Sequence, residues 1–263
     1  MMASQVTVLN FDHVYERQSF YRRVNHEWVD FSDLAGTRGY CEAGVQEAIR
    51  RRLQQRRCKG ISFIGSGNYH YVTYLLLQEK GVPFTLVLFD RHLDMTPAPG
   101  ELLSCGSWAA RALQELEHLV FLVAVGIEPE QEDFLPPGLR DKVLVLPAPE
   151  LVPEARAADR MVAAIPTRQV YISIDKDVLS RRDAVTDWEQ GPMTLEQLLY
   201  FLQRIGEGKE ICGVDVCGEL PVSWADDWVP QNRWAAARNN RANAKILDLV
   251  LSLVKKKAYL TAG

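Results

Sequence analysis

The string FTLVLFDRHLD occupies residues 84–94 and decides how the rest of the chain is interpreted. Residues 84–89 are apolar except for Thr85, which is typical of a strand buried on both faces of a parallel sheet. Directly after it, acids and a histidine fall on every second residue, and alternate residues of an extended chain share one face. We therefore expect Asp90, His92 and Asp94 to point to the same side.

A second string of this kind, SIDKD at residues 173–177, overlaps the end of the apolar run at 170–174. The same alternation predicts that Asp175 and Asp177 lie together while Lys176 points away. Aspartate is also common in turns, so an ordinary turn is the alternative interpretation of this string alone. Four carboxylates and an imidazole that converge at strand ends are costly to bury without cations. The two strings together predict a metal site, and one with two metals.

Apolar runs alternate with amphipathic stretches along the whole chain. Further strands are expected at 6–11, 60–65, 119–125, 142–146 and 211–216, and helices at 42–57, 69–80, 104–115, 153–164, from Thr194 onward as N-cap, and at 232–256. This alternation predicts an α/β fold with three layers, α/β/α, around a mainly parallel sheet. A closed barrel is a weaker alternative because the strand spacing is irregular. No linker divides residues 1–263, so we expect one domain.

Sites in such sheets lie beyond the carboxyl ends of the strands. The string GSGNYH at 65–70 follows an expected strand, which places His70 at the same sheet edge as the two acidic strings. A lone histidine is more often structural, but beside these acids we expect a metal ligand. The glycines would also allow a tight turn with a phosphate at a helix start, although their spacing matches neither dinucleotide nor P-loop fingerprints.

Two further stretches lie where they could contribute to the site. Ser104 and Cys105 precede an expected helix, where Ser104 could be a simple N-cap and Cys105 would have a lowered pKa. Asp215 lies inside the apolar run of the last strand and would need a partner if buried. Glu219 follows that strand and could bind a cationic substrate, or be a solvated loop acid.

Bulk properties narrow the class of partner. The formal net charge of −4 argues against a nucleic-acid partner, and no apolar stretch is long enough to span a bilayer, so we expect no membrane partner. The five cysteines are an odd number without a CxxC pair, which fits free thiols in a reducing cytosol. These properties predict a cytoplasmic protein.

Together these motifs resemble the arginase/agmatinase (ureohydrolase) superfamily. The family's GGDH string corresponds to residues 67–70, its DAHxD to 90–94 and its SxDxD to 173–177. The resemblance implies an arginase-like fold with two Mn²⁺ ions at the strand ends, in place of which other divalent metals could bind. It also implies the roles of the ligands: Asp90 and Asp175 bridge the metals, His70 and Asp94 complete one site, and His92 and Asp177 complete the other.

The chain departs from the family pattern at several positions. Asn68-Tyr69 replaces the usual Gly-Asp, and the Asp-Pro that normally follows SxDxD is absent. Cys105 stands where arginases have a proton-shuttle histidine, and we consider it as a substitute proton donor. The family's Asp–Glu pair corresponds to Asp215 and Glu219 with one extra residue between them, and the resemblance implies that Glu219 binds the guanidinium.

The resemblance implies a manganese-dependent hydrolase that attacks a C–N bond of a cationic guanidino or amidino-type small molecule with a hydroxide held between the metals. Asp94 would orient this nucleophile, Glu219 would bind the substrate, and Cys105 would donate a proton. Two alternatives stay open: a deacetylase-like amide hydrolase with one zinc, and a metal-binding relative without catalytic activity. The family also leads us to expect a homo-oligomer.

Overall fold

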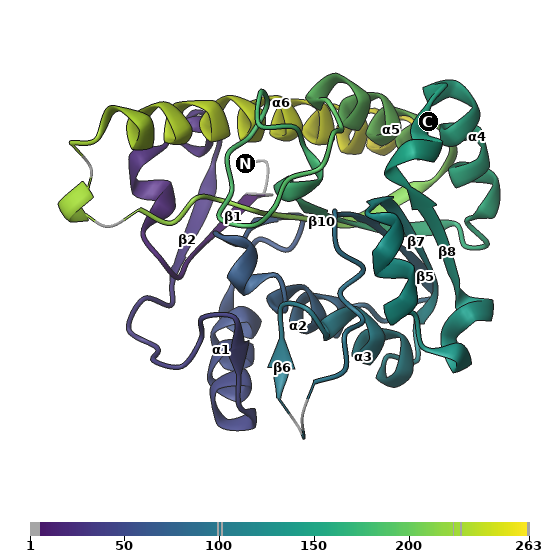
Figure 1. The fold of residues 1–263 in the computed structure, drawn as a ribbon, viewed down its shortest axis with the longest axis horizontal. Helices are drawn as coiled ribbons and strands as arrows, with labels where there is room; N and C mark the ends of the chain where they lie inside the picture. Colours follow the sequence, from purple (N-terminus) through teal and green to yellow (C-terminus); the bar gives the residue numbers. More distant parts are fainter. Residues whose placement is uncertain (1–5, 99, 101, 223, 227, 262–263) are drawn as a thin grey trace.

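The computed structural model describes residues 6–98, 100, 102–222, 224–226 and 228–261. At its centre is an eight-stranded sheet with parallel pairing between all neighbours, in the order β2-β1-β4-β10-β9-β5-β7-β8 (Figure 1). Its strands are β1 (Val6–Asn10), β2 (His26–Asp30), β4 (Ile61–Phe63), β5 (Phe84–Phe89), β7 (Leu119–Ile127), β8 (Val143–Pro147), β9 (Gln169–Asp175) and β10 (Glu210–Cys217). A separate antiparallel pair is formed by β3 (Tyr40–Cys41) and β6 (Leu103–Ser104).

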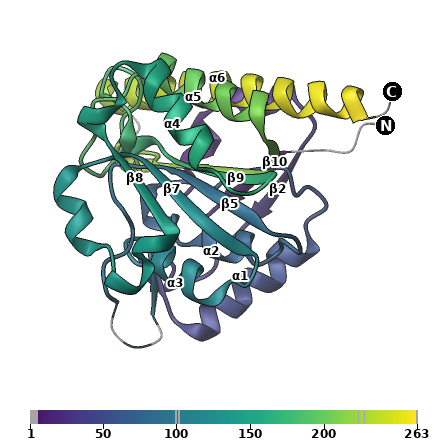
Figure 2. The same ribbon diagram turned by 90° about the vertical axis from the view of Figure 1, so that its right-hand side faces the viewer.

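Helices cover both faces of the sheet (Figure 1; Figure 2). One layer consists of α1 (Ala43–Gln55), α2 (Val72–Leu77) and α3 (Trp108–Glu115), and the other of α4 (Glu154–Ala164), α5 (Leu195–Gly208) and α6 (Pro230–Thr261). Short 3₁₀ turns connect these elements: η1 (Val14–Arg17), η2 (Phe20–Arg23), η3 (Gly67–Tyr69), η4 (Pro129–Phe134), η5 (Pro137–Lys142), η6 (Ala148–Leu151), η7 (Lys176–Val178) and η8 (Trp224–Asp226).

The side chains of strand β5 are buried on both faces of the central sheet. Leu86 and Leu88 pack into the core beneath α1–α3, whereas Val87 and Phe89 pack into the core beneath α4–α6. Alternate residues of a strand face opposite sides, so a strand with apolar residues on both faces needs a cover on each side. The expected three-layer α/β/α class is therefore confirmed.

Local expectations were met where the chain carries strong signals. Thr194 caps α5 as expected, because its Oγ1 accepts a hydrogen bond from the backbone N–H of Gln197 at 3.1 Å while the Gln197 side chain accepts one from Thr194 at 2.9 Å. Strand β2 was missed because it lies at the sheet edge and is polar and half-buried. The helix expected at 69–80 is wrong in extent, since η3 precedes a shorter α2.

Four neighbouring strands, β4, β10, β9 and β5, bring their carboxyl ends to one edge of the sheet. The strings at 65–70, 90–94, 173–177 and 213–219 follow or end these strands, so the sheet order itself assembles the site. Among the described residues, no helix combines the length and the apolar character that a membrane span requires.

Candidate metal centre

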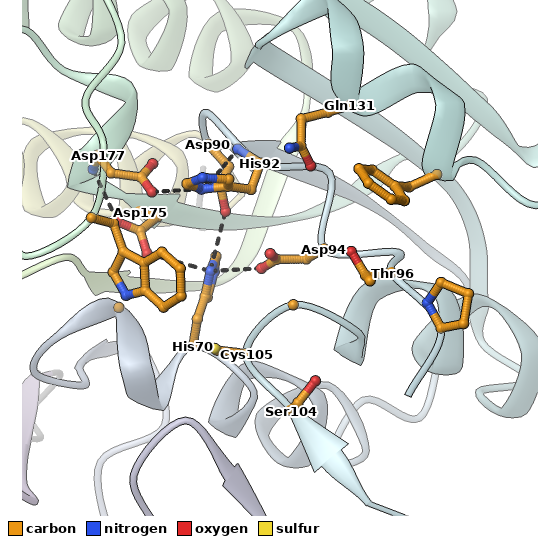
Figure 3. A pocket seen from close by; sticks show the side chains of 15 residues that line it. His70, Asp90, His92, Asp94, Thr96, Ser104, Cys105, Gln131, Asp175 and Asp177 are labelled. Carbon is orange, nitrogen blue, oxygen red and sulfur yellow. Dashed lines mark hydrogen bonds and ion pairs between the residues drawn. The ribbon is translucent and has the colours of Figure 1, made fainter. Parts of the chain in front are cut away.

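Six side chains converge at this sheet edge, on the floor of a cavity of about 330 Å³ (Figure 3). We call them the acid cluster: His70, Asp90, His92, Asp94, Asp175 and Asp177. All are buried except His92, whose side chain is 25% exposed. The structure thus brings together all the metal ligands expected from the sequence.

One half of the acid cluster is built around the His70 ring. Its Nδ1 faces carboxylate oxygens of Asp94 at 3.1 Å, Asp90 at 3.2 Å and Asp175 at 3.6 Å (Figure 3). One ring nitrogen cannot serve three carboxylates with a single proton. His70, Asp90 and Asp94 form a group whose ligand atoms lie within 4.8 Å of one another.

The other half is built around His92. Its Nδ1 lies 2.8 Å from an oxygen of Asp177 and 3.5 Å from Oδ1 of Asp90. Asp90, His92 and Asp177 form a second group within 4.8 Å. Because Asp90 belongs to both groups, the geometry suits two ions that share a carboxylate.

The side chains converge through turns and not through strand alternation, which corrects the sequence interpretation. Strand β5 ends at Phe89, before the first acid, and η7 begins at Lys176. Oδ1 of Asp90 accepts a hydrogen bond from the backbone N–H of His92 at 2.7 Å, and Oδ1 of Asp175 accepts one from Asp177 at 2.9 Å. These short-range bonds fold each acid-x-acid or acid-x-histidine segment into a turn.

Asp94 completes this arrangement with an unusual backbone. Its φ of 53° lies in the left-handed region, which is uncommon for a residue other than glycine. Its Oδ2 accepts a hydrogen bond from Nε1 of the fully buried Trp108 at 2.6 Å. Trp108 was not predicted as a site residue, since an apolar residue at a helix start gives no polar signal.

A hydrogen-bonded chain supports His70 from behind. Its Nε2 lies 2.9 Å from Oγ of Ser173, which donates to Oδ1 of Asp215 at 2.7 Å. Thr73 also donates to Oδ1 of Asp215, at 3.1 Å. The buried Asp215 thus has the partners that the sequence required, and the chain leaves Nδ1 of His70 free to bind an ion.

The electrostatics of the acid cluster show how strongly its acids repel one another. Burial and the charge of Asp90 raise the pKa of Asp175 to about 6. Burial and the charge of Asp175 raise the pKa of Asp177 well above its ordinary value. Burial alone would lower the pKa of His92, but its hydrogen bonds with Asp177 and Asp90 raise this pKa to about 12. Two imidazoles carry too little positive charge to neutralise four buried carboxylates. Bound cations would supply the missing positive charge.

The donor set fits divalent metal ions. Donor atoms about 2.1 Å from one ion and at right angles lie about 3 Å apart, close to the spacings of 3.1 and 3.2 Å around His70. Oδ2 of Asp90 is buried without a hydrogen-bond partner among the described residues. Hard carboxylate oxygens with two imidazoles suit manganese, zinc, cobalt or iron.

Cys105 lines the cavity, but not in the state expected from the sequence. Ser104 belongs to strand β6 and α3 begins only at Trp108, so Cys105 lies in a turn and Ser104 is not an N-cap. Burial and the charge of Asp94 raise the pKa of Cys105 to about 12. The expected lowering of this pKa is therefore wrong, because the thiol lacks a helix N-terminus and faces carboxylates.

Glu219 is not brought to the cavity. Its buried carboxylate forms an ion pair with Lys176, which is itself fully buried. It also accepts hydrogen bonds from Gln18 at 2.8 Å, Asn239 at 2.9 Å and Asn243 at 2.7 Å. We call these five residues the lysine cluster. Lys176 thus points away from its neighbouring acids as expected, and it occupies the carboxylate that the resemblance assigned to a guanidinium.

The remaining cavity wall is uncharged among the described residues. It consists of Gly67, Thr96, Pro97, Ser104, Gly106, Gln131, Phe134 and Trp188, beside Cys105. The Trp188 ring stands edge-on to His92, with ring centroids 5.8 Å apart. The side-chain amide of Asn68 donates a hydrogen bond at 2.7 Å to Asp187, the residue before Trp188, and so holds the loop that carries Trp188. A Cβ on Gly67 would lie 2.9 Å from Asp175 and 3.0 Å from Trp188, so only glycine allows this close approach.

Comparisons with known proteins agree with this geometry. The model of the Arginase family matches residues 5–223. An uncharacterized protein of Thermotoga maritima is 32% identical over 248 residues, which cover 94% of this chain and 90% of that protein.

Solved structures share the fold at lower sequence identity. A formimidoylglutamase from Bacillus subtilis superposes with a TM-score of 0.67 at 14% identity, covering 94% of this chain and 86% of that one. The proclavaminate amidino hydrolase from Streptomyces clavuligerus gives 0.66 at 16%, covering 95% and 92%. A hypothetical agmatinase from Burkholderia thailandensis gives 0.65 at 20%, covering 93% and 83%. The family match over most of the sequence, on a fold that these structures share, establishes that the chain belongs to the arginase family.

Proposed function

We propose that the chain is a ureohydrolase-type enzyme that uses two divalent metal ions to cleave a C–N bond of a guanidino or amidino-type group in a small molecule. The observation that carries this proposal is the acid cluster on the floor of a cavity (Figure 3). The proteins of similar fold include an amidino hydrolase and a formimidoylglutamase, which supports this bond type.

The ligand assignment follows the two groups of the acid cluster. His70 and Asp94 would hold one ion and His92 and Asp177 the other, and Asp90, which belongs to both groups, would contribute to both. Asp175 lies beside His70 and would be shared as the resemblance to the family implies. Manganese is the first candidate because four of the six ligands are carboxylates. When bound, two such metal ions supply Lewis acidity and an activated water for attack on carbon.

The chain's own residues would position the reactants and move the proton. Trp108 fixes Asp94 by its hydrogen bond, so that Asp94 can orient the attacking water. The thiol of Cys105 lies in the cavity wall and stays protonated because its pKa is raised. It would pass its proton to the departing nitrogen, and the thiolate would then regain a proton from solvent. We assign Glu219 no substrate contact, because Lys176 already neutralises it.

The chemistry of the cavity wall indicates which charge and polarity the non-reacting part of the substrate has. An arginine-like substrate carries a charged amino and carboxylate end, but the described wall offers it no opposite charge. Trp188 and Phe134 are each 41% exposed and offer apolar rings at the cavity. We therefore propose a cationic reacting group attached to an uncharged, apolar arm.

The test is a substrate panel given to metal-loaded protein, with release of urea or ammonia as the readout. The panel pairs aryl-alkyl guanidines and amidines with arginine, whose arm is charged. We expect turnover of the apolar compounds and little or none of arginine, and loss of turnover in Asp177→Asn. The exposed acid Glu189 supplies the control variant Glu189→Gln, which should retain activity.

Two outcomes would replace this proposal. One tightly bound metal per chain, with hydrolysis of acylated amines, would indicate a deacetylase-like amide hydrolase. Two bound metals without turnover of any panel compound would indicate a relative that binds metal and has no catalytic role.

A further inference from the structure

Cys217 contacts the acid cluster from beneath, outside the cavity wall. It is the last residue of β10 and pairs in register with Asp175 of β9. Its side chain is fully buried, and its Sγ donates a hydrogen bond to Oδ2 of Asp175 at 3.1 Å. Cys217 is therefore placed by the sheet itself, with no loop between it and the acid cluster.

The sulfur belongs to a third group of ligand atoms. Those of His70, Asp175 and Cys217 lie within 4.8 Å of one another. His70 and Asp175 are already candidate ligands of one ion, and Cys217 would be added to the same side. An oxygen about 2.1 Å and a sulfur about 2.3 Å from one ion lie about 3.1 Å apart at a right angle and about 3.6 Å apart at a tetrahedral angle. The observed 3.1 Å between Sγ and Oδ2 lies at the lower end of this range.

The neighbouring glycine allows this approach. Gly218 has a φ of +82°, and a Cβ there would lie 2.4 Å from Oδ1 of Asp175. Only a residue without a side chain lets the end of β10 come so near to the acid. The backbone thus brings Cys217 close enough for its sulfur to contact the carboxylate.

The two halves of the acid cluster differ in this respect. The group of Asp90, His92 and Asp177 contains oxygen and nitrogen donors and no cysteine among the described residues. The half around His70 has a soft donor within reach. Thiolate ligands favour zinc, cobalt or iron, whereas manganese prefers carboxylates.

We propose that Cys217 is a ligand of the metal ion held by His70 and Asp175, and that this ion is zinc, cobalt or iron while manganese suits the site of His92. The inference rests on the proposed metal pair and deepens it. On binding, the S–H bond breaks, a sulfur–metal bond forms and the proton passes to solvent. The hydrogen bond from Cys217 to Asp175 is then replaced by a shared ion.

The test is the absorption spectrum of cobalt-loaded protein. A thiolate bound to Co²⁺ gives a sulfur-to-metal charge-transfer band in the near ultraviolet, which imidazole and carboxylate do not give. We expect this band in the wild type, its loss in Cys217→Ser and its retention in Cys105→Ser, which removes the cysteine of the cavity wall. A wild type without the band, or a band that disappears only in Cys105→Ser, would overturn the inference.

A second measurement needs no variant, so it holds if Cys217→Ser does not fold. X-ray absorption of zinc-loaded wild type should contain a sulfur scatterer at about 2.3 Å. Elemental analysis after incubation with one equivalent of zinc per chain and manganese in excess should give one ion of each per chain. Only nitrogen and oxygen around zinc would reduce Cys217 to a hydrogen-bond donor. Hydrolysis is not a readout here, so a bound sulfur without turnover would contradict the proposed function alone.

Discussion

The acid cluster and the lysine cluster share one short segment, residues 175–177, whose side chains alternate between them. The two clusters differ in how their buried charges are neutralised. Asp175 and Asp177 join two other carboxylates and two imidazoles, which leaves negative charge in excess. Lys176, between them, forms a one-to-one ion pair with Glu219 that three amide side chains complete. A buried charge is tolerated when it is paired, so the first cluster requires cations from outside and the second does not.

The largest effect should follow from removing the shared carboxylates. In Asp90→Asn/Asp175→Asn, each ion loses its bridging charges, so we expect more than about 100-fold weaker metal binding. Isothermal titration and elemental analysis measure this. The same protein without metal should unfold no more easily than wild type, because repulsion inside the acid cluster falls. Unchanged metal content would contradict the assignment of the site.

The lysine cluster should respond in the opposite manner. Lys176→Met leaves Glu219 buried and unpaired, which should lower the free energy of unfolding by about 3–5 kcal/mol. Adding Glu219→Gln removes the unpaired buried charge and should recover much of the lost free energy of unfolding. Urea unfolding in the presence of a chelator gives both values without a metal contribution. A loss below about 1 kcal/mol in Lys176→Met would show that the pair is not needed for stability.

An intermediate effect should come from the support behind His70. Ser173→Ala breaks the chain from His70 to Asp215, and loss of such an outer partner weakens metal affinity about 10–100-fold. Thr73→Val is the matched control, because it removes only the hydroxyl that bonds Asp215 and leaves the backbone hydrogen bond from Thr73 to the His70 carbonyl in place. If both variants weaken metal binding equally, Asp215 acts through general packing and not through the histidine.

The smallest effect concerns Asp12, an acid that belongs to neither cluster. Burial raises the pKa of Asp12 to about 6, and its Oδ1 has no hydrogen-bond partner among the described residues. The neutral acid is thus favoured in the folded protein, so the stability it contributes is complete below about pH 3.8 and is lost as the pH rises through about 6.

Asp12→Asn should therefore stabilise the metal-free protein by about 1–2 kcal/mol at pH 8 and by much less at pH 4. Thermal or urea unfolding at the two pH values measures the difference. An equal gain at both pH values would mean that the substitution acts through packing and that the charge of Asp12 is irrelevant.

The fold could be predicted because its signals are local. The run 84–89 has apolar residues on both faces, and the helix cap at Thr194 depends only on residues three apart in the sequence. Edge strand β2 gave no such signal because solvent accepts its polar side chains. Burial on two sides restricts composition strongly, and burial on one side does so weakly.

The residues that meet in the acid cluster could be predicted from spacing, but the reason given for their convergence was wrong. Alternation in a strand and a hydrogen-bonded turn after a strand can both bring residues i and i+2 together, and only the backbone distinguishes them. The role of Glu219 could not be read from the sequence at all. Its partners Gln18, Asn239 and Asn243 lie far from it along the chain.

The sequence by itself determined the layered sheet and the residues that meet at its edge, because periodicity and strand-end acids act over a few residues. Only the tertiary structure decided which buried groups are paired within the protein and which can bind a ligand. It paired Glu219 with Lys176, placed Cys217 beneath Asp175, and raised the pKa of Cys105 instead of lowering it. Each of these depends on contacts between distant segments, since the energy of a buried charge or thiol is set by the neighbours that the fold supplies.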